Sequence, residues 1–259
     1  MIDLERLETI AATAGDKIKG VQETGDLTKD RKADDSPVTN ADLTASDYIR
    51  ERLLDETPYT YVDEEHGITD KDTTKWWLVD PLDGTKEFMR GSTEYTVNIA
   101  LIDDETPVLG VVHAPATNTS YVAKHGEAWK DNEELHIKPT QVQDVVVAVS
   151  KSHPDDDLDG FLQTLPTSGR RGIGSSLKGC RLAENTVHLY PRMQSLYGWD
   201  VAAMHAVIRG SGGTMTQWGG DDLRYDKDSP RIQPFIAGHP DVVSDVQAAW
   251  EDYDPDPES

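Results

Sequence analysis

The residues best suited to chemistry lie in a short acidic segment that ends at Thr85 and reads Trp-Leu-Val-Asp-Pro-Leu-Asp-Gly-Thr. Asp80 and Asp83 stand three residues apart after an apolar run, and clustered carboxylate oxygens are the ligands that hard cations such as Mg²⁺ prefer. Gly84 lets the backbone pass close to a ligand, and the N–H groups at a following helix start suit an anion. The segment therefore predicts a site for a metal ion and a phosphate, although such a turn alone is more often a solvated loop.

Three further acidic segments could join this site. Asp42 falls in the first turn of an expected helix, where it either complements the helix dipole or orients a hydroxyl or a metal-bound water. Glu64 and Glu65 precede an expected turn, where paired acids are ordinarily solvated, and no role is expected for the adjacent His66. Asp200 opens another expected helix, where an aspartate is an ordinary cap. Taken singly, none of these segments predicts a function.

Basic side chains are scarce, so those beside a Gly/Ser turn are candidates for binding an anion. Lys178 follows the turn at residues 172–176, and Arg192 follows a Tyr-Pro pair. Arg170 and Arg171 precede the same turn. The alternative for each of these side chains is simple solvation at the surface.

The composition predicts a globular protein of the cytoplasm. The chain has 259 residues, 36% of them hydrophobic, and carries no long apolar run, so we expect a soluble protein without a membrane span. The N-terminus shows no basic stretch followed by an apolar one, so no signal peptide is expected. Cys180 is the single cysteine, which excludes an internal disulfide and fits a reducing compartment. We expect Cys180 to be a small buried residue without a catalytic role.

The charge of the chain is strongly negative. It carries 48 acidic and 25 basic residues, a formal net charge of −23. Such a surface disfavours nucleic-acid polymers, whose binding depends on lysine and arginine. Because salt screens self-repulsion, and because the acids are spread along the whole chain, one hypothesis is a protein adapted to a high-salt cytoplasm. An ordinary acidic protein is the alternative.

Apolar spacing predicts two helices at the start of the chain. Residues 3–22 carry apolar side chains at spacings of three and four, which is typical of an amphipathic helix. A second helix is expected to begin at Thr39 or Asn40, either of which can cap it. We expect the second helix to direct three side chains into a core: Leu43, Ile49 and Leu53.

The middle of the chain predicts strands. Residues 76–79 predict a buried strand, and Pro81, which cannot donate to a sheet, predicts that it ends at Asp80. Residues 95–102 and 108–113 predict a hairpin with its turn at 105–107. A second pair of strands is expected at residues 121–123 and 128–130.

These patterns predict two halves and a tail. Residues 1–139 read as an α+β half, with helices packed on a largely antiparallel sheet. Residues 140–250 read as an α/β half, and residues 251–259 as a disordered acidic tail. In the second half we expect strands at 145–149 and 187–190, and helices at 158–165, 176–184 and 201–209.

Taken together, the acidic segments resemble the inositol-monophosphatase-like, Mg²⁺-dependent, lithium-sensitive phosphatases. The resemblance rests on the acidic pair at 64–65, the Trp-to-Thr segment ending at Thr85, and the Trp-Asp-Val-Ala-Ala segment at 199–203. Further runs resemble the CysQ-type 3′(2′),5′-bisphosphate nucleotidase branch, and the match covers nearly the whole chain except its tail. These runs are residues 32–42, 83–88, 95–102, 107–112, 174–178 and 189–192.

The resemblance implies a layered α-β-α-β-α fold, with an antiparallel N-terminal sheet and a mixed or parallel C-terminal sheet. It implies that two or three Mg²⁺ ions are held by the carboxylates of Glu64, Asp80, Asp83 and Asp200 and by the backbone carbonyl of Leu82. It implies that Asp42 and Thr85 position and deprotonate a metal-bound water, with Glu64 also counted in the catalytic group. Substrate contacts are implied for Gly84, Thr85, Ser175, Lys178, Arg192 and, more weakly, His153. One departure is Asp63, where a small serine or glycine is expected; we expect it to add negative charge beside the metals.

The implied activity is hydrolysis of the 3′-phosphate of adenosine 3′,5′-bisphosphate, which gives AMP and phosphate. Inositol monophosphatases and fructose-1,6-bisphosphatases share the same metal core, so they are the near alternatives. A non-catalytic cation-binding protein is a remote one. The expected partner is a small phosphate ester, and both a monomer and a homodimer remain open.

Overall fold

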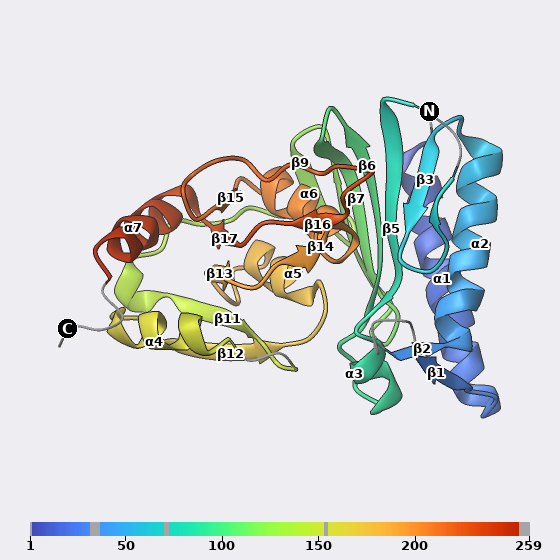
Figure 1. Cartoon of the computed structure of the whole chain (residues 1–259), viewed down its shortest axis with the longest axis horizontal. Coiled ribbons are helices and arrows are strands. Elements are labelled where there is room, and N and C mark those ends of the chain that lie inside the picture. The colour runs from blue at the N-terminus through green and yellow to red at the C-terminus, as the bar shows by residue number, and fades with distance from the viewer. Residues whose placement is uncertain (1, 32–36, 70–72, 153–154, 254–259) are drawn as a thin grey trace.

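The computed structural model describes residues 2–31, 37–69, 73–152 and 155–253, which form five stacked layers (Figure 1). Helices α1 (Leu4–Thr24) and α2 (Asn40–Glu56) form one outer layer. An eight-stranded sheet, a helical layer and a five-stranded sheet follow in turn (Figure 1). The middle layer holds α5 (Leu177–Ala183) and α6 (Ala202–Gly210), and the far outer layer holds α4 (Asp156–Thr164) and α7 (Pro240–Glu251). The predicted α-β-α-β-α fold is confirmed.

The eight-stranded sheet has the order β10-β9-β8-β7-β6-β5-β3-β4. Its neighbours are antiparallel except for β3 and β5, which are parallel. Both predicted hairpins are present, although the turn of the first one lies at Asp104 and Glu105. The strands are β3 (Thr60–Asp63), β4 (Gly67–Ile68), β5 (Lys75–Asp83), β6 (Thr96–Asp103), β7 (Thr106–Ala114), β8 (Thr119–Lys124), β9 (Glu127–Lys130) and β10 (Glu133–Glu134).

The five-stranded sheet has the order β12-β11-β13-β17-β15 and is mixed. β11 is parallel to both of its neighbours, whereas β17 is antiparallel to β13 and β15. Its strands are β11 (Val146–Ser150), β12 (Gly169–Ile173), β13 (Leu189–Arg192), β15 (Thr214–Gln217) and β17 (Phe235–Gly238). The short elements are β1 (Lys29–Arg31), β2 (Pro37–Thr39), α3 (Thr85–Met89), η1 (Val142–Asp144), β14 (Leu196–Tyr197), η2 (Gly198–Asp200) and β16 (Arg231–Ile232). The division of the chain into two halves near residue 139 stays a prediction.

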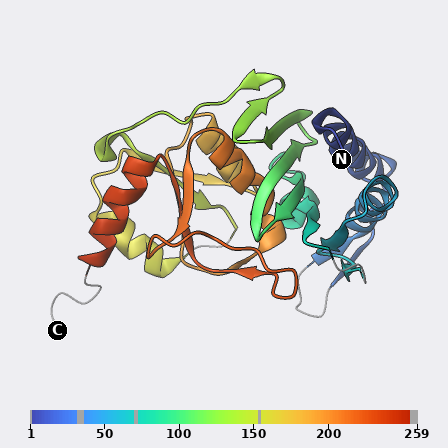
Figure 2. The same cartoon turned by 90° about the horizontal axis from the view of Figure 1, so that it is seen from above.

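The apolar side chains form three clusters that match the spaces between the layers. One cluster lies between α1, α2 and the large sheet, a second surrounds α5 and α6, and a third lies beneath α4 and α7. Figure 2 shows the same order from above, with the outer helices at the two ends of the molecule. Burial of these faces is what holds the acidic segments in place, because such cores are close-packed and resist displacement.

Two further local details differ from the sequence-based expectations. Leu43 was expected in the core but is 43% exposed, whereas Ile49 and Leu53 are fully buried. β5 does not end at Asp80 but runs to Asp83, with a register shift against β6 between these two residues. Pro81 therefore interrupts the hydrogen-bond ladder without ending the strand, because the neighbouring strand still pairs on both sides of the shift.

The last described residues pack on the far outer layer. Glu251 is the last residue of α7, and the ring of Tyr253 stands edge-on to Phe161 of α4 with centroids 5.3 Å apart. Residues 254–259, which make up most of the predicted tail, lie outside the described residues. Across the described part of the chain, no helix has the length and apolar character needed to cross a membrane.

Candidate active site

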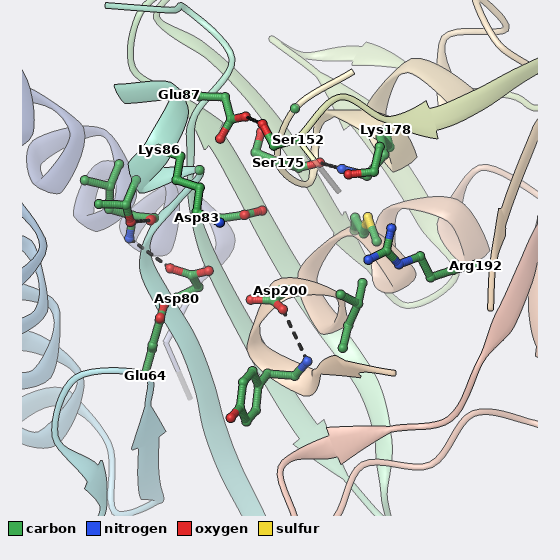
Figure 3. A pocket seen from close by; sticks show the side chains of 18 of the residues that line it. Glu64, Asp80, Asp83, Lys86, Glu87, Ser152, Ser175, Lys178, Arg192 and Asp200 are labelled. Carbon is green, nitrogen blue, oxygen red and sulfur yellow. Dashed lines mark hydrogen bonds between the residues drawn. The ribbon is translucent and has the colours of Figure 1, made fainter. Parts of the chain in front are cut away.

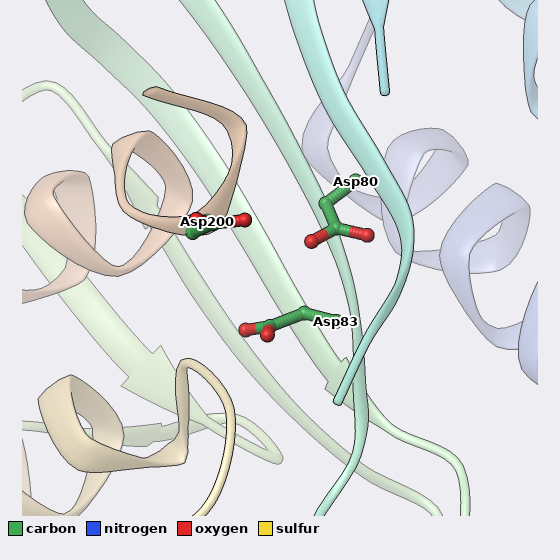
Figure 4. Close-up of side chains that lie close together, drawn as sticks. All are labelled: Asp80, Asp83 and Asp200. Atoms are coloured by element: carbon green, nitrogen blue, oxygen red, sulfur yellow. The ribbon is translucent and has the colours of Figure 1, made fainter. Parts of the chain in front are cut away.

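Three aspartates from two distant parts of the chain converge at one point. Asp80 and Asp83 lie at the end of β5, and Asp200 ends the short η2 helix before α6 (Figure 4). Each offers a carboxylate oxygen, and these oxygens all lie within 4.8 Å of one another. Glu64 lines the same cavity, with its carboxylate directed toward Asp80 (Figure 3). This arrangement matches the donor set that hard divalent cations prefer.

Burial and mutual repulsion disfavour the ionised form of these carboxylates, and a bound cation would offset both effects. Burial raises the pKa of Asp200 well above its usual value, and the charges of Asp83 and Glu64 raise it further. Burial also raises the pKa of Asp83, although the nearby Lys178 ammonium acts in the opposite direction. Because buried like charges repel one another, the residues present fit a site for divalent cations.

Two polar residues that the sequence did not single out hold Asp83 in place. The backbone N–H and the hydroxyl of Ser176 lie 2.6 and 2.9 Å from Asp83 Oδ2. Asn98 Nδ2 donates to Ser176 Oγ at 2.8 Å and to Asp83 Oδ2 at 3.3 Å. Ser176 Oγ also lies 2.7 Å from the carbonyl oxygen of Asp200, so one hydroxyl connects the two acidic segments. The sequence contained a signal for the role of Asn98, because this residue is a lone amide within an apolar strand.

Thr85 and Asp42 form the pair that the resemblance implied. Thr39 caps α2 as predicted, and its backbone N–H and hydroxyl donate to Asp42 Oδ2 at 2.8 and 2.6 Å. The other oxygen, Oδ1, accepts from Thr85 Oγ1 at 3.0 Å. Thr85 Oγ1 also lies 3.1 Å from the Leu82 carbonyl oxygen, which places that carbonyl at the cavity as well. Burial raises the pKa of Asp42, whereas its hydrogen bonds lower it.

Gly84 occupies a position that other residues would strain. Its φ of 90° lies in the left-handed region, and an added Cβ would approach the carbonyl oxygen of Glu94 to 3.0 Å. The same Cβ would lie 3.5 Å from the side chain of Ser175, which belongs to the other side of the cavity. The glycine therefore lets the segment after β5 pack closely against the Gly/Ser turn.

Two buried cations lie on the other side of the same cavity, which has a volume of about 450 Å³. Lys178 is 8% exposed, and its Nζ donates to the Ser175 carbonyl at 2.7 Å (Figure 3). Arg192 is 6% exposed, and its Nη2 donates to Gln194 Oε1 at 3.0 Å. Burial lowers the pKa of Lys178, while the charge of Asp83 raises it. The cavity thus has an acidic and a basic end.

Other candidates lie away from this cavity. Arg170 forms a salt bridge with Asp159 at 2.7 Å, and Arg171 lines a separate cavity of about 130 Å³. His153 lies outside the described residues. Cys180 is fully buried as expected, and burial raises its pKa well above the usual value.

The segment around Asp63 differs from its expectation. Asp63 is 1% exposed, and its Oδ2 accepts from the Ser46 and Tyr61 hydroxyls, the latter at 3.1 Å. Its other oxygen accepts from the backbone N–H of His66 at 2.7 Å. The carboxylate therefore faces the outer helices instead of the cavity. The expectation that Asp63 adds negative charge beside the metals is wrong. His66 is exposed, as is usual for a turn histidine, although its Nδ1 lies 2.8 Å from Ser46 Oγ.

With this geometry established, comparison with known proteins defines the class. The pattern of the inositol monophosphatase family matches residues 4–251, and the chain belongs to that family. Extragenic suppressor protein SuhB from Bartonella henselae has the same fold, with a TM-score of 0.80 at 24% identity over 93% of this chain and 95% of that one. The resemblance predicted from the sequence is confirmed.

More similar relatives narrow the comparison within the family. The 3′(2′),5′-bisphosphate nucleotidase CysQ of Salmonella typhimurium is 43% identical over 236 residues, which cover 86% of this chain and 93% of that protein. A crystal structure of CysQ from Bacteroides thetaiotaomicron has a TM-score of 0.74 at 31% identity, covering 89% of this chain and 94% of that chain. This chain is thus similar to proteins of the nucleotidase branch over nearly all of its length.

Proposed function

We propose that this protein is a Mg²⁺-dependent phosphomonoesterase that removes the 3′-phosphate of adenosine 3′,5′-bisphosphate, yielding AMP and phosphate. The names of two similar proteins support the substrate class. The convergent carboxylates of Asp80, Asp83 and Asp200 support the metal. We place the protein in the cytoplasm on the basis of its composition.

The observation that carries this proposal is one cavity with two ends of opposite charge. A phosphate monoester carries close to two negative charges near neutral pH, so bare carboxylates repel it and divalent cations reverse that repulsion. Lys178 and Arg192, both nearly buried, face the same cavity and provide charge for a second phosphate. A substrate with two phosphates would satisfy both ends.

Two or three Mg²⁺ ions held by Glu64, Asp80, Asp83, Asp200 and the Leu82 carbonyl would supply positive charge to the reacting phosphate and lower the pKa of water. The protein itself would then position the proton transfer. Because Thr85 Oγ1 donates to Asp42, its lone pairs remain able to accept a hydrogen bond from a water. The raised pKa of the Asp42 carboxylate makes it a better proton acceptor behind that hydroxyl. Gly84 and Thr85 would contact the phosphate.

The substrates of the near alternatives would use the metal end of the cavity in the same way. They differ in whether they carry a second phosphate for the basic end. An inositol monophosphate has no second phosphate for Lys178 and Arg192, whereas fructose 1,6-bisphosphate has one. A non-catalytic cation-binding protein needs neither Thr85 nor Asp42 beside its carboxylates. The buried cations therefore favour a bisphosphate substrate.

Released phosphate measured over a panel of substrates tests the proposal. We expect turnover of adenosine 3′,5′-bisphosphate to exceed that of inositol 1-phosphate and fructose 1,6-bisphosphate, to require Mg²⁺, and to fall with lithium. Asp80→Ala should abolish turnover while the melting temperature shows a retained fold. A preference for the inositol ester would overturn the substrate, and unchanged turnover in Asp80→Ala would overturn the metal assignment.

A further inference from the structure

Arg231 lies on the wall of the cavity and has no role in the proposed chemistry. It belongs to β16, which pairs with β14 in a small antiparallel sheet, so that Tyr197 stands opposite Arg231. Both residues line the cavity, together with Leu196 of β14. The wall adjoins the acidic end, because Tyr197 lies three residues before Asp200 and its backbone N–H donates to Asp200 Oδ2 at 3.2 Å.

Arg231, Tyr197 and Trp199 form a stack. The rings of Tyr197 and Trp199 are nearly parallel, at 10°, with centroids 4.6 Å apart. The guanidinium carbon of Arg231 lies 4.3 Å from the centroid of the Tyr197 ring, and Arg231 Nη2 donates to the Tyr197 hydroxyl at 3.1 Å. At these distances a ring and a guanidinium group cannot share one face of Tyr197, so they cover opposite faces. Arg231 is therefore an outer layer of the stack, and it is exposed.

Two interactions hold the guanidinium group over the Tyr197 ring. Cation–π attraction keeps it over the tyrosine ring, and the hydrogen bond limits its rotation in that plane. A planar guanidinium group presents its second face as a stacking surface, and nucleobases stack on such planes as they do on aromatic rings. The flexible side chain is thereby preorganised, which reduces the entropy lost on binding.

The position of the Arg231 guanidinium group suits the nucleobase of the proposed substrate. The two phosphates are directed to the acidic and basic ends of the cavity, which leaves the base to contact the rest of the lining. One part of that lining carries Glu87, whose carboxylate accepts a hydrogen bond from the Ser152 hydroxyl (Figure 3). Glu87 is anionic, whereas the wall of Leu196, Tyr197 and Arg231 offers an apolar side chain, an aromatic ring and a planar guanidinium group.

We propose that the guanidinium face of Arg231, supported by Tyr197, is the binding surface for the nucleobase and makes the enzyme select a nucleotide over a sugar phosphate. This inference rests on the proposed function and adds a specificity-determining residue to it. Base stacking of this kind contributes about tenfold or more in affinity.

The test compares a substrate with and without its base. The values of kcat/KM are measured for adenosine 3′,5′-bisphosphate and for ribose 3,5-bisphosphate, which lacks the adenine, with the wild type and Arg231→Ala. We expect Arg231→Ala to lower kcat/KM for the nucleotide about tenfold and to leave the abasic substrate within about twofold. Arg231→Lys keeps the charge but loses the plane, so it should resemble Arg231→Ala.

Controls separate this inference from the proposed function. Arg224→Ala removes another exposed arginine, which pairs with Glu105 at 3.0 Å, and should leave both substrates unchanged. An equal loss on both substrates in Arg231→Ala, or full rescue by Arg231→Lys, would show that Arg231 acts on phosphate, and no loss would show that the base binds elsewhere; each result overturns the inference. If the wild type itself prefers inositol 1-phosphate to the nucleotide, the proposed function fails first.

Discussion

The hydroxyl oxygen of Ser176 lies 2.9 Å from the carboxylate of Asp83 and 2.7 Å from the backbone carbonyl oxygen of Asp200. A serine hydroxyl has one proton, so it can donate to only one of these acceptors at a time. Its lone pair meanwhile accepts from Asn98. The spacing of two acidic segments thus depends on one small side chain.

Removing that hydroxyl should weaken divalent-cation binding. Ser176→Ala leaves Asp83 with one fewer charge-assisted hydrogen bond, and we expect the affinity for Mg²⁺ or Mn²⁺ to fall about tenfold. Isothermal titration of the metal-free protein measures this without relying on turnover. Ser211→Ala is a matched control, because Ser211 is also buried but follows α6 and donates to the Val207 carbonyl of that helix at 2.8 Å. Equal affinities in the two variants would contradict a positioning role for Ser176.

Neutralising Asp42 should lower the rate of the chemical step. Asp42→Asn keeps the shape of the side chain but removes the proton acceptor behind Thr85, so we expect kcat to fall by about 10²–10⁴. The KM and the metal affinity should change much less. Asp47→Asn is the control on the same helix, since the Asp47 side chain is 72% exposed. A loss confined to KM would assign Asp42 to binding alone.

Replacing Lys178 should affect the second phosphate. Lys178→Met keeps much of the buried volume and removes the charge, so we expect KM for adenosine 3′,5′-bisphosphate to rise at least tenfold. Adenosine 3′-monophosphate, which lacks the second phosphate, should be hydrolysed with nearly unchanged KM. An equal rise with the monophosphate would remove Lys178 from the recognition of that group.

Salt should stabilise the folded protein. With a net charge of −23, the compact chain repels itself in dilute buffer, and screening reduces this repulsion. We expect the melting temperature to rise between dilute buffer and molar KCl. A non-ionic osmolyte at equal osmolality serves as the control for exclusion effects. A melting temperature that is unchanged or lower in KCl would contradict adaptation to high salt.

Acid should destabilise the protein through two buried histidines. Burial lowers the pKa of His113 to about 4 and that of His205 to about 3, against 6.5 for the unperturbed group. Between these values the unfolded chain binds more protons, so their contribution to stability is complete above pH 6.5 and is lost as the pH falls. For His113, the stability lost between pH 6.5 and pH 4 amounts to about 3 kcal/mol.

The raised pKa values of Asp42, Asp83 and Asp200 act with the opposite sign, so the test compares variants. His113→Gln should show a smaller loss of unfolding free energy between pH 6.5 and 4 than the wild type does. The change in the exposed His136→Gln should match that of the wild type. Parallel pH dependence in all three proteins would contradict a buried neutral His113.

The sequence by itself determined the local features of this protein. The Thr39 cap with Asp42 in the first helical turn, the two hairpins and the apolar stripe of α1 follow from short-range spacing and side-chain chemistry. The order of its acidic segments was enough to identify the family, because those motifs are jointly specific.

Only the tertiary structure decided which side chains meet. Asp200 reaches Asp80 and Asp83 because α6 packs between the two sheets, and the roles of Ser176 and Asn98 exist only in that contact. The sequence also could not predict the direction of the Asp63 side chain, because side chains alternate between the two faces of a strand and packing decides which face is covered. Local propensity sets the elements of this fold, while burial between its layers sets the site.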